Sequence, residues 1–272
     1  MVKGGTISTG QTQMMVADGR QLECQWIGPQ NADGPVLVFL HEGLGCIALW
    51  RDFPQTLCDE LGLRGFVYSR AGYGGSETCD LPRPVSFMHH EAEIVLPQVL
   101  DAAGINNAVL IGHSDGGSIG LIHAGSGVVG NGQTRRICGL VTLAAHVFNE
   151  DISVQSITGA KLAYDEGDLR QRLKKYHSDV DAAFRGWNDV WLHDDFRQWN
   201  IEEFLPGIRV PTLVLQGADD PYGTQKQVEA IVAGIGDQAQ KLIIADCGHS
   251  PHLEQSEETR QLIVAFVGNN GL

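Results

Sequence analysis

The sequence predicts an α/β protein built on a mostly parallel sheet. Short apolar runs alternate along the chain with stretches in which apolar residues recur at helical spacing. Runs such as 36–40 and 137–143 have no polar face, which is typical of strands covered by helices on both sides. Strands and helices that alternate in this way form parallel sheets through right-handed crossovers. The 272 residues, 43% of them hydrophobic, are enough for one large core.

The predicted elements follow in order along the chain. Two runs over 14–18 and 21–27 flank an Asp-Gly turn at Asp18, which predicts a hairpin. The later strands are expected over 36–40, 65–69, 108–111, 137–143, 210–215 and 241–245. The helices are expected over 50–61, 87–103, 118–124, 225–233 and 257–267. Pro97 lies inside the second of these helices, so we expect a kink or a late start there.

The segment 146–207 interrupts the alternation. It carries helical stretches rich in charge and tryptophan, over 162–176, 180–191 and 195–204. We interpret it as a helical cap inserted into a single α/β core. The predicted organisation is therefore a first part of the core over 1–145, the cap over 146–207 and the second part of the core over 208–272.

Composition restricts the partners of the protein. A formal net charge of −14 argues against nucleic acid and against anionic membranes. No apolar run is long enough to span a membrane, and residues 1–6 carry no secretory signal. The six cysteines are scattered, which favours free thiols in a reducing cytoplasm over a zinc site or a disulfide framework. We expect a small-molecule substrate as the partner, and the sequence leaves a homodimer open.

The candidate nucleophile is a serine in a glycine-rich turn. The predicted strand 108–111 runs directly into Gly112-His113-Ser114-Asp115-Gly116, the pattern G-x-S-x-G between a strand and a helix. A serine on so tight a turn needs small neighbours, and glycines at both ends supply them. The N-terminus of the helix favours negative charge at the serine oxygen. Taken alone, the pentapeptide also fits a simple turn with a surface serine.

Two later strand ends carry an acid and a histidine. Asp219 and Asp220 follow the strand at 210–215, and His249 follows the strand at 241–245. Catalytic groups of open α/β sheets gather at the carboxyl ends of the strands. A serine, an acid and a histidine in this chain order are the arrangement of α/β-hydrolases.

With these motifs the chain resembles the α/β-hydrolase fold superfamily, in the cap-bearing branch of serine hydrolases that includes esterases and meta-cleavage-product hydrolases. The motifs that carry the resemblance are 112–116, 215–220, 248–253 and the loop 72–76, and they extend over nearly the whole chain. The resemblance implies an α/β-hydrolase fold, with a mostly parallel central sheet, helices on both faces and an inserted helical cap.

The resemblance also implies a role for individual residues. Ser114 is expected to be the nucleophile and His249 its base. Asp220 is the preferred acid because it lies three residues after Gly217, and Asp219 is then expected to cap the turn. The backbone N–H groups of Gly43 and Asp115 are expected to form the oxyanion hole.

Three charged residues depart from the family pattern. Glu42 stands next to Gly43, so its carboxylate must face away from the oxyanion, bind a cation or do separate chemistry. Asp115 either favours the helix N-terminus or contacts a polar or cationic group of the substrate. Arg70 is expected to pair with an internal acid rather than with a substrate carboxylate. Trp187 and Trp191 lie one turn apart on one face, and their spacing leaves open whether that face meets the core or the pocket.

We therefore expect a serine hydrolase that cleaves a small carboxylic ester or thioester through an acyl-enzyme on Ser114. It needs no cofactor and no metal, and Glu42, Trp187 and Trp191 are candidate substrate contacts. A carbon–carbon bond hydrolase of the meta-cleavage type, with Arg185 or Arg197 at a substrate carboxylate, is an alternative. A lactonase or perhydrolase would use the same triad. A ligand sensor on a hydrolase scaffold is the non-enzyme alternative.

Overall fold

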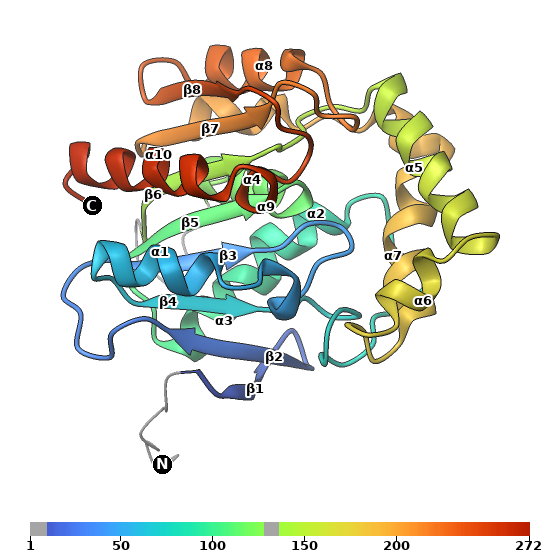
Figure 1. Cartoon of the computed structure of the whole chain (residues 1–272), viewed down its shortest axis with the longest axis horizontal. Coiled ribbons are helices and arrows are strands. Elements are labelled where there is room, and N and C mark those ends of the chain that lie inside the picture. Colours follow the sequence, from blue (N-terminus) through green and yellow to red (C-terminus); the bar gives the residue numbers. More distant parts are fainter. Residues whose placement is uncertain (1–9, 128–135) are drawn as a thin grey trace.

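An eight-stranded sheet runs through the molecule (Figure 1). The computed structural model describes residues 10–127 and 136–272; the opening residues 1–6, where no secretory signal is expected, lie outside these ranges. The strand order is β1-β2-β4-β3-β5-β6-β7-β8. The strands are β1 Thr12–Ala17, β2 Arg20–Ile27, β3 Val36–Leu40, β4 Gly65–Tyr68, β5 Ala108–His113, β6 Ile137–Leu143, β7 Thr212–Gly217 and β8 Ala239–Ile244.

The sheet is mostly parallel, as the sequence predicts. Strands β1 and β2 form the expected hairpin, in which Ala17 pairs with Arg20, and β2 is antiparallel to β4. The pairs from β4 through β3, β5, β6 and β7 to β8 are all parallel. The carboxyl ends of these parallel strands therefore meet at one edge of the sheet, where Figure 1 shows helices α5 to α7.

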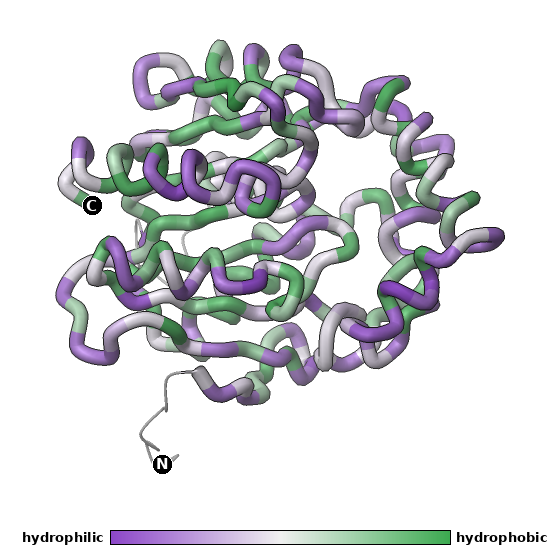
Figure 2. Tube along the Cα trace, in the orientation of Figure 1, coloured by the Kyte–Doolittle hydropathy of each residue, from purple (hydrophilic) through white to green (hydrophobic). Residues whose placement is uncertain are grey.

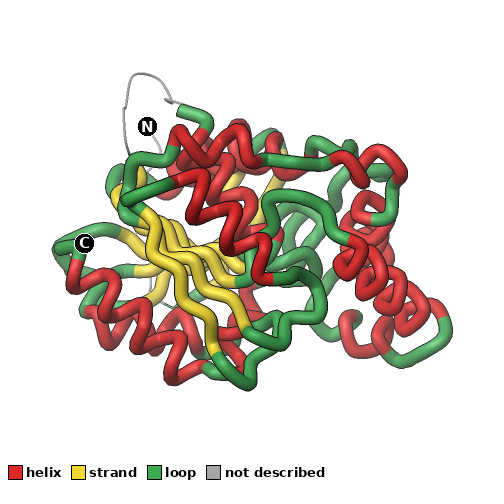
Figure 3. The backbone as a smooth tube through the Cα atoms, turned by 90° about the horizontal axis from the view of Figure 1, so that it is seen from above, coloured by secondary structure: helices red, strands yellow, loops and turns green. Residues whose placement is uncertain are grey.

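Helices cover both faces of the sheet, as the view from above shows (Figure 3). One core joins the sheet to α1 (Phe53–Leu61) and α10 (Ser256–Asn269). The other joins it to α3 (Leu96–Ala103), α4 (Asp115–Gly125) and α8 (Gln225–Ile235). The central strands are the most hydrophobic part of the chain (Figure 2), because both of their faces pack against helices.

The predicted helix over 87–103 is irregular near its proline. It consists of α2 (Phe87–His90), a π-helical turn (Glu91–Val95) and α3. Pro97 has no amide hydrogen, and its ring clashes with the carbonyl four residues earlier in a regular helix. The structure therefore has a wider turn before the proline in place of the predicted kink or late start.

The segment 146–207 forms helices α5 (Asp151–Asp165), α6 (Leu169–Leu173) and α7 (Val180–Trp191). Helix α7 has its predicted bounds, whereas α5 begins eleven residues before the predicted start at 162. The first part of α5 is rich in Ser, Thr and Gly, which are weak helix formers and obscure the helical pattern. The predicted helix 195–204 is replaced by two 3-10 turns, Asp194–Gln198 and Glu202–Gly207.

His177 ties this segment to the core. Its Nδ1 accepts a hydrogen bond from the N–H of Gly74 at 3.0 Å, and its Nε2 donates to the carbonyl of Leu44 at 3.1 Å. These two contacts join the segment to the loops after β4 and β3. The segment is therefore attached to the loops that surround the carboxyl ends of the strands.

Candidate active site

Ser114 lies on the sharp turn between β5 and α4. Its φ of 52° and ψ of −119° are strained for a residue with a side chain, and its N–H donates to the carbonyl of Leu143 at 2.8 Å. A Cβ at Gly112 would lie 2.4 Å from the carbonyl oxygen of Gly116, and a Cβ at Gly116 would lie 2.0 Å from that of Leu40. Both glycines are therefore required by close backbone packing, which holds the serine at the strand end.

The structure brings Ser114, His249 and Asp220 together. The Nε2 of His249 lies 3.0 Å from Oγ of Ser114, and its Nδ1 lies 2.9 and 3.0 Å from the two carboxylate oxygens of Asp220. Asp219 is exposed and uses its N–H to bond the carbonyl of Cys247 at 2.9 Å. Of the two competing acids, the structure places only Asp220 against the histidine.

Asp220 is held as a carboxylate. Its side chain is buried, and Oδ1 also accepts the N–H of Tyr222 at 2.8 Å. Burial disfavours its charged form, but the hydrogen bond and charge of His249 outweigh this cost and lower the pKa of Asp220. A carboxylate that accepts the Nδ1 proton leaves the Nε2 lone pair facing the Ser114 hydroxyl, which is the arrangement that a general base needs.

The two predicted oxyanion donors flank the serine. The N–H of Asp115 is the first of α4, and such an N–H has no acceptor within its helix. Gly43 lies in the loop after β3 and lines the same cavity as Ser114. A Cβ at Gly43 would lie 2.2 Å from the ring of Trp187, so only glycine fits under this indole. The oxyanion hole itself stays a prediction.

Glu42 finds a histidine partner inside the protein. Its Oε2 lies 3.4 Å from Nδ1 of His113, whose Nε2 lies 2.8 Å from the carbonyl oxygen of His249. Both ring nitrogens of His113 therefore face an oxygen acceptor. Burial would raise the pKa of Glu42, but the hydrogen bond and charge of His113 lower it well below its usual range. This pair, which sequence reasoning missed, links the oxyanion loop to the histidine loop.

The side chain of Asp115 is fully buried and is not among the residues that line the cavity. Its Oδ1 accepts from Nε1 of Trp191 at 3.2 Å, and its Oδ2 has no partner. Burial raises the pKa of Asp115, against the opposing charge of Arg70. Of the two alternatives for this side chain, its place in the first turn of α4 fits the helix N-terminus, and its enclosure under the tryptophan speaks against a substrate contact.

Arg70 also departs from expectation. Its guanidinium is buried and donates to the carbonyls of His41 and Glu42, the latter at 3.0 Å, and its Nε has no partner. Arg70 forms no direct ion pair with an acid among the described residues, contrary to the prediction, because its hydrogen bonds go to the oxyanion loop; its charge still acts on Asp115 and Glu91. The arginine holds that loop in place, a role that its position two residues after the end of β4 could have indicated.

A cavity of about 200 Å³ lies over Ser114 and His249. Trp187 and Trp191 of α7 line it together with Glu42, so the face that these two tryptophans share turns to the pocket. The remaining wall includes Leu44, His146, Ser153, Ile157 and Tyr222. The cavity is thus small and mostly apolar, with three aromatic side chains and a few polar groups near the serine.

Metal ligands do not gather here. Within 10–127 and 136–272, no group of three or more His, Cys, Asp or Glu side chains could hold a metal ion. Over the same ranges, no helix is both long and apolar enough to cross a membrane. All six cysteines are free thiols.

Comparison with known proteins agrees with this geometry. The model of the alpha/beta hydrolase family matches residues 37–262. The chain belongs to the alpha/beta hydrolase family. The predicted resemblance and fold class are therefore confirmed, and membership of a hydrolase family supports an enzyme.

Several relatives in this family extend over almost the whole chain. A 3-oxoadipate enol-lactonase from Acinetobacter baylyi is 25% identical, over 92% of this chain and 94% of its own length. A 2-hydroxy-6-oxo-6-phenylhexa-2,4-dienoate hydrolase from Comamonas testosteroni is 22% identical, over 88% and 89%. The esterase structure from Exiguobacterium antarcticum has a TM-score of 0.74 at 19% identity, over 95% of this chain and all of its own. At these identities the relatives differ in reaction while the fold is shared.

Proposed function

We propose that this protein is a serine hydrolase that cleaves a small carboxylic ester or thioester. The observation that carries the proposal is the chain of contacts from Asp220 through His249 to Ser114, with distances of 2.9 and 3.0 Å. A serine hydroxyl is a weak nucleophile unless an oriented base takes its proton, and this arrangement supplies one.

In the proposed reaction, Oγ of Ser114 attacks the substrate carbonyl carbon while Nε2 of His249 takes the hydroxyl proton. Asp220 stabilises the imidazolium that forms. The N–H groups of Gly43 and Asp115 receive the oxyanion. His249 returns the proton to the leaving alcohol or thiol, and the acyl group stays on Ser114. Water, deprotonated by the same histidine, then releases the acid and restores the enzyme.

The cavity favours a small, uncharged acyl group. Its volume of about 200 Å³ is below the range of about 300–1,000 Å³ that is common for drug-sized ligands. No lysine or arginine is among the described residues that line it, and Glu42 gives the wall one carboxylate. A substrate carboxylate would therefore find no cationic partner at this wall, whereas a neutral ester would bind without penalty.

This wall argues against the carbon–carbon bond hydrolase. Arg185 is exposed, and Arg197 hydrogen-bonds to Asp151 at 3.1 Å; neither lines the cavity. A lactone is a cyclic ester that the same steps would open. The enol-lactonase name of one relative makes a small lactone the second substrate class to test.

A labelling experiment tests the proposal. The folded wild-type protein should react with a fluorophosphonate probe, Ser114→Ala should not, and the matched control Ser156→Ala should react like the wild type. Hydrolysis of p-nitrophenyl acetate and butyrate should exceed that of the decanoate. A folded wild type that neither reacts with the probe nor hydrolyses any of these esters would contradict the proposal and favour the ligand sensor.

A further inference from the structure

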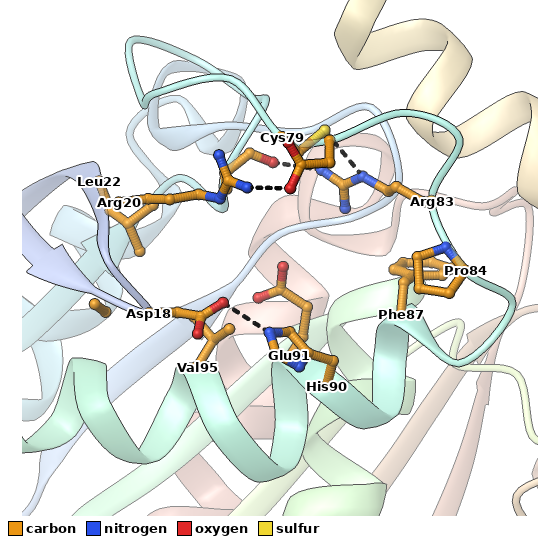
Figure 4. A pocket seen from close by; sticks show the side chains of 13 residues that line it. Asp18, Arg20, Leu22, Cys79, Arg83, Pro84, Phe87, His90, Glu91 and Val95 are labelled. Carbon is orange, nitrogen blue, oxygen red and sulfur yellow. Dashed lines mark hydrogen bonds and ion pairs between the residues drawn. The ribbon is translucent and has the colours of Figure 1, made fainter.

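A second, larger cavity lies beside the β1–β2 hairpin (Figure 4). Its volume is about 330 Å³, and it shares no lining residue with the cavity over Ser114. The hairpin, the loop 71–84 and the start of the helix at 87–95 form its walls. Nothing in the proposed hydrolysis uses this space.

Most of the charged groups around this cavity already have partners. Arg20 pairs with Asp80 at 2.6 Å, and His90 pairs with Asp18 at 2.7 Å. Arg83 donates to the thiol of Cys79 at 3.3 Å and to a backbone carbonyl. These pairs, drawn as dashed lines in Figure 4, surround the cavity without filling it.

Glu91 is the exception. Its carboxylate points into the middle of the cavity (Figure 4), the residue is only 6% exposed, and its buried Oε2 has no hydrogen-bond partner. Burial raises the pKa of Glu91, and the charges of Arg70 and Arg83 offset this only in part. Glu91 opens the π-helical turn, a feature that is frequent at functional sites.

We propose that this cavity binds a primary amine carried on a short hydrocarbon chain, with the ammonium group on the carboxylate of Glu91. A buried carboxylate without a partner is costly, and a charged donor relieves that cost better than a neutral one. Leu22, Phe87 and Val95 give the hydrocarbon an apolar wall.

The pairing of the charged groups along the wall agrees with a cation. The lining side chains include the carboxylates of Asp18, Asp80 and Glu91, the guanidinium groups of Arg20 and Arg83, and the imidazole of His90, which pairs with Asp18. Because each guanidinium is already held by acceptors, the acceptor left over is Glu91. An anionic ligand would have to displace one of these contacts, whereas an ammonium group displaces none.

Calorimetric titration of the full chain with n-pentylamine tests the site, with pentanol and pentanoate as neutral and anionic probes of the same length. The experiment uses Ser114→Ala, so that reaction at the serine contributes nothing and the outcome is independent of the proposed hydrolysis. Pentylamine should bind more tightly than both other probes. Equal or tighter binding of pentanol or pentanoate would overturn the proposal, as would no binding of the amine at tens of millimolar.

Two variants place the binding in the cavity. Glu91→Gln should weaken pentylamine about tenfold or more, since it removes the charge and keeps the shape. The control Glu93→Gln makes the same charge change on the same helix, does not line the cavity, and should leave binding within about twofold. Ala71 lines the cavity from the loop side, and the larger side chain of Ala71→Leu should occupy that space. This variant should therefore prevent binding of the amine while the carboxylate of Glu91 remains. Binding that survives both Glu91→Gln and Ala71→Leu would show that the amine sits elsewhere.

Discussion

Asp220 and Asp115 are the two buried aspartates of the described chain, and they are held in opposite ways. Asp220 receives His249 on both carboxylate oxygens and a backbone N–H on one. Asp115 receives a single indole N–H from Trp191, and its other oxygen has no partner. The pKa of Asp220 is lowered, and burial raises the pKa of Asp115.

The difference shows that the hydrogen-bond partner of each carboxyl, rather than its burial, sets the direction of its pKa shift. Burial penalises both carboxylates, but the histidine offers Asp220 a ring that can become positively charged. The indole offers Asp115 a neutral donor, and the charge of Arg70 offsets only part of the cost of burial. We therefore infer that Asp220 acts in the chemistry and that Asp115 holds Trp191 over the cavity, and each role can be tested by substitution.

The largest effect is expected from Asp220→Asn. The amide keeps the shape but presents an N–H to Nδ1 of His249, which favours the wrong tautomer. We expect kcat for a small ester to fall by about 10⁴-fold. The control Asp219→Asn, at the exposed neighbouring acid, should stay within about twofold of the wild type. A larger loss in the Asp219 variant would reverse the assignment of the acid.

A smaller effect, on stability, is expected from Trp191→Phe. The change removes the donor to Oδ1 of Asp115 and leaves a buried carboxyl without any hydrogen bond. Loss of such a partner costs about 1–3 kcal/mol in the free energy of unfolding, beyond the loss of ring contacts. Urea unfolding should show this excess relative to Trp187→Phe, which removes the same ring atoms without touching Asp115. Equal losses in the two variants would mean that the indole N–H contributes nothing.

Much of the fold and the candidate triad could be predicted because both depend on local pattern. Apolar runs fix the strands, and the residues just after them reach one edge of the sheet whatever the details of packing. The sequence predicts the start of β7 two residues early, at 210. Pro211 has no N–H to donate within a central strand, so β7 begins at Thr212.

The contacts around the triad could not be predicted, because they join residues far apart in the chain. Glu42 meets His113 across 71 positions, and Trp191 meets Asp115 across 76. The sequence shows that Glu42 and Asp115 are charged residues near strand ends and that Trp191, a hydrogen-bond donor, lies on a helix. Which of them meet is decided by how the loops and α7 pack, and this packing has no local pattern in the sequence.

The smallest effect is expected from Asp115→Asn, and its pH dependence separates the two aspartates. The folded protein holds the Asp115 proton more tightly than the unfolded chain does, because burial raises the pKa of this carboxyl. Stability therefore falls as pH rises through the interval between the unfolded and folded pKa values, and it stays lower above that interval. Removing the ionisable group should make the variant more stable than the wild type at pH 8, by about 1 kcal/mol, and equal to it near pH 4.

Asp220→Asn should give the opposite slope in the same measurement. The lowered pKa of Asp220 means that its contribution to stability is present at neutral pH and is lost as pH falls through the folded value. This variant should therefore be less stable than the wild type at pH 7, with a difference that shrinks on acidification. Urea unfolding of both variants and the wild type at pH 8, 6 and 4 checks the two slopes. If Asp115→Asn is instead less stable than the wild type at pH 8, the negative charge of Asp115 is needed to balance the charge of Arg70. The two aspartates would then not differ in the direction of their contribution to stability.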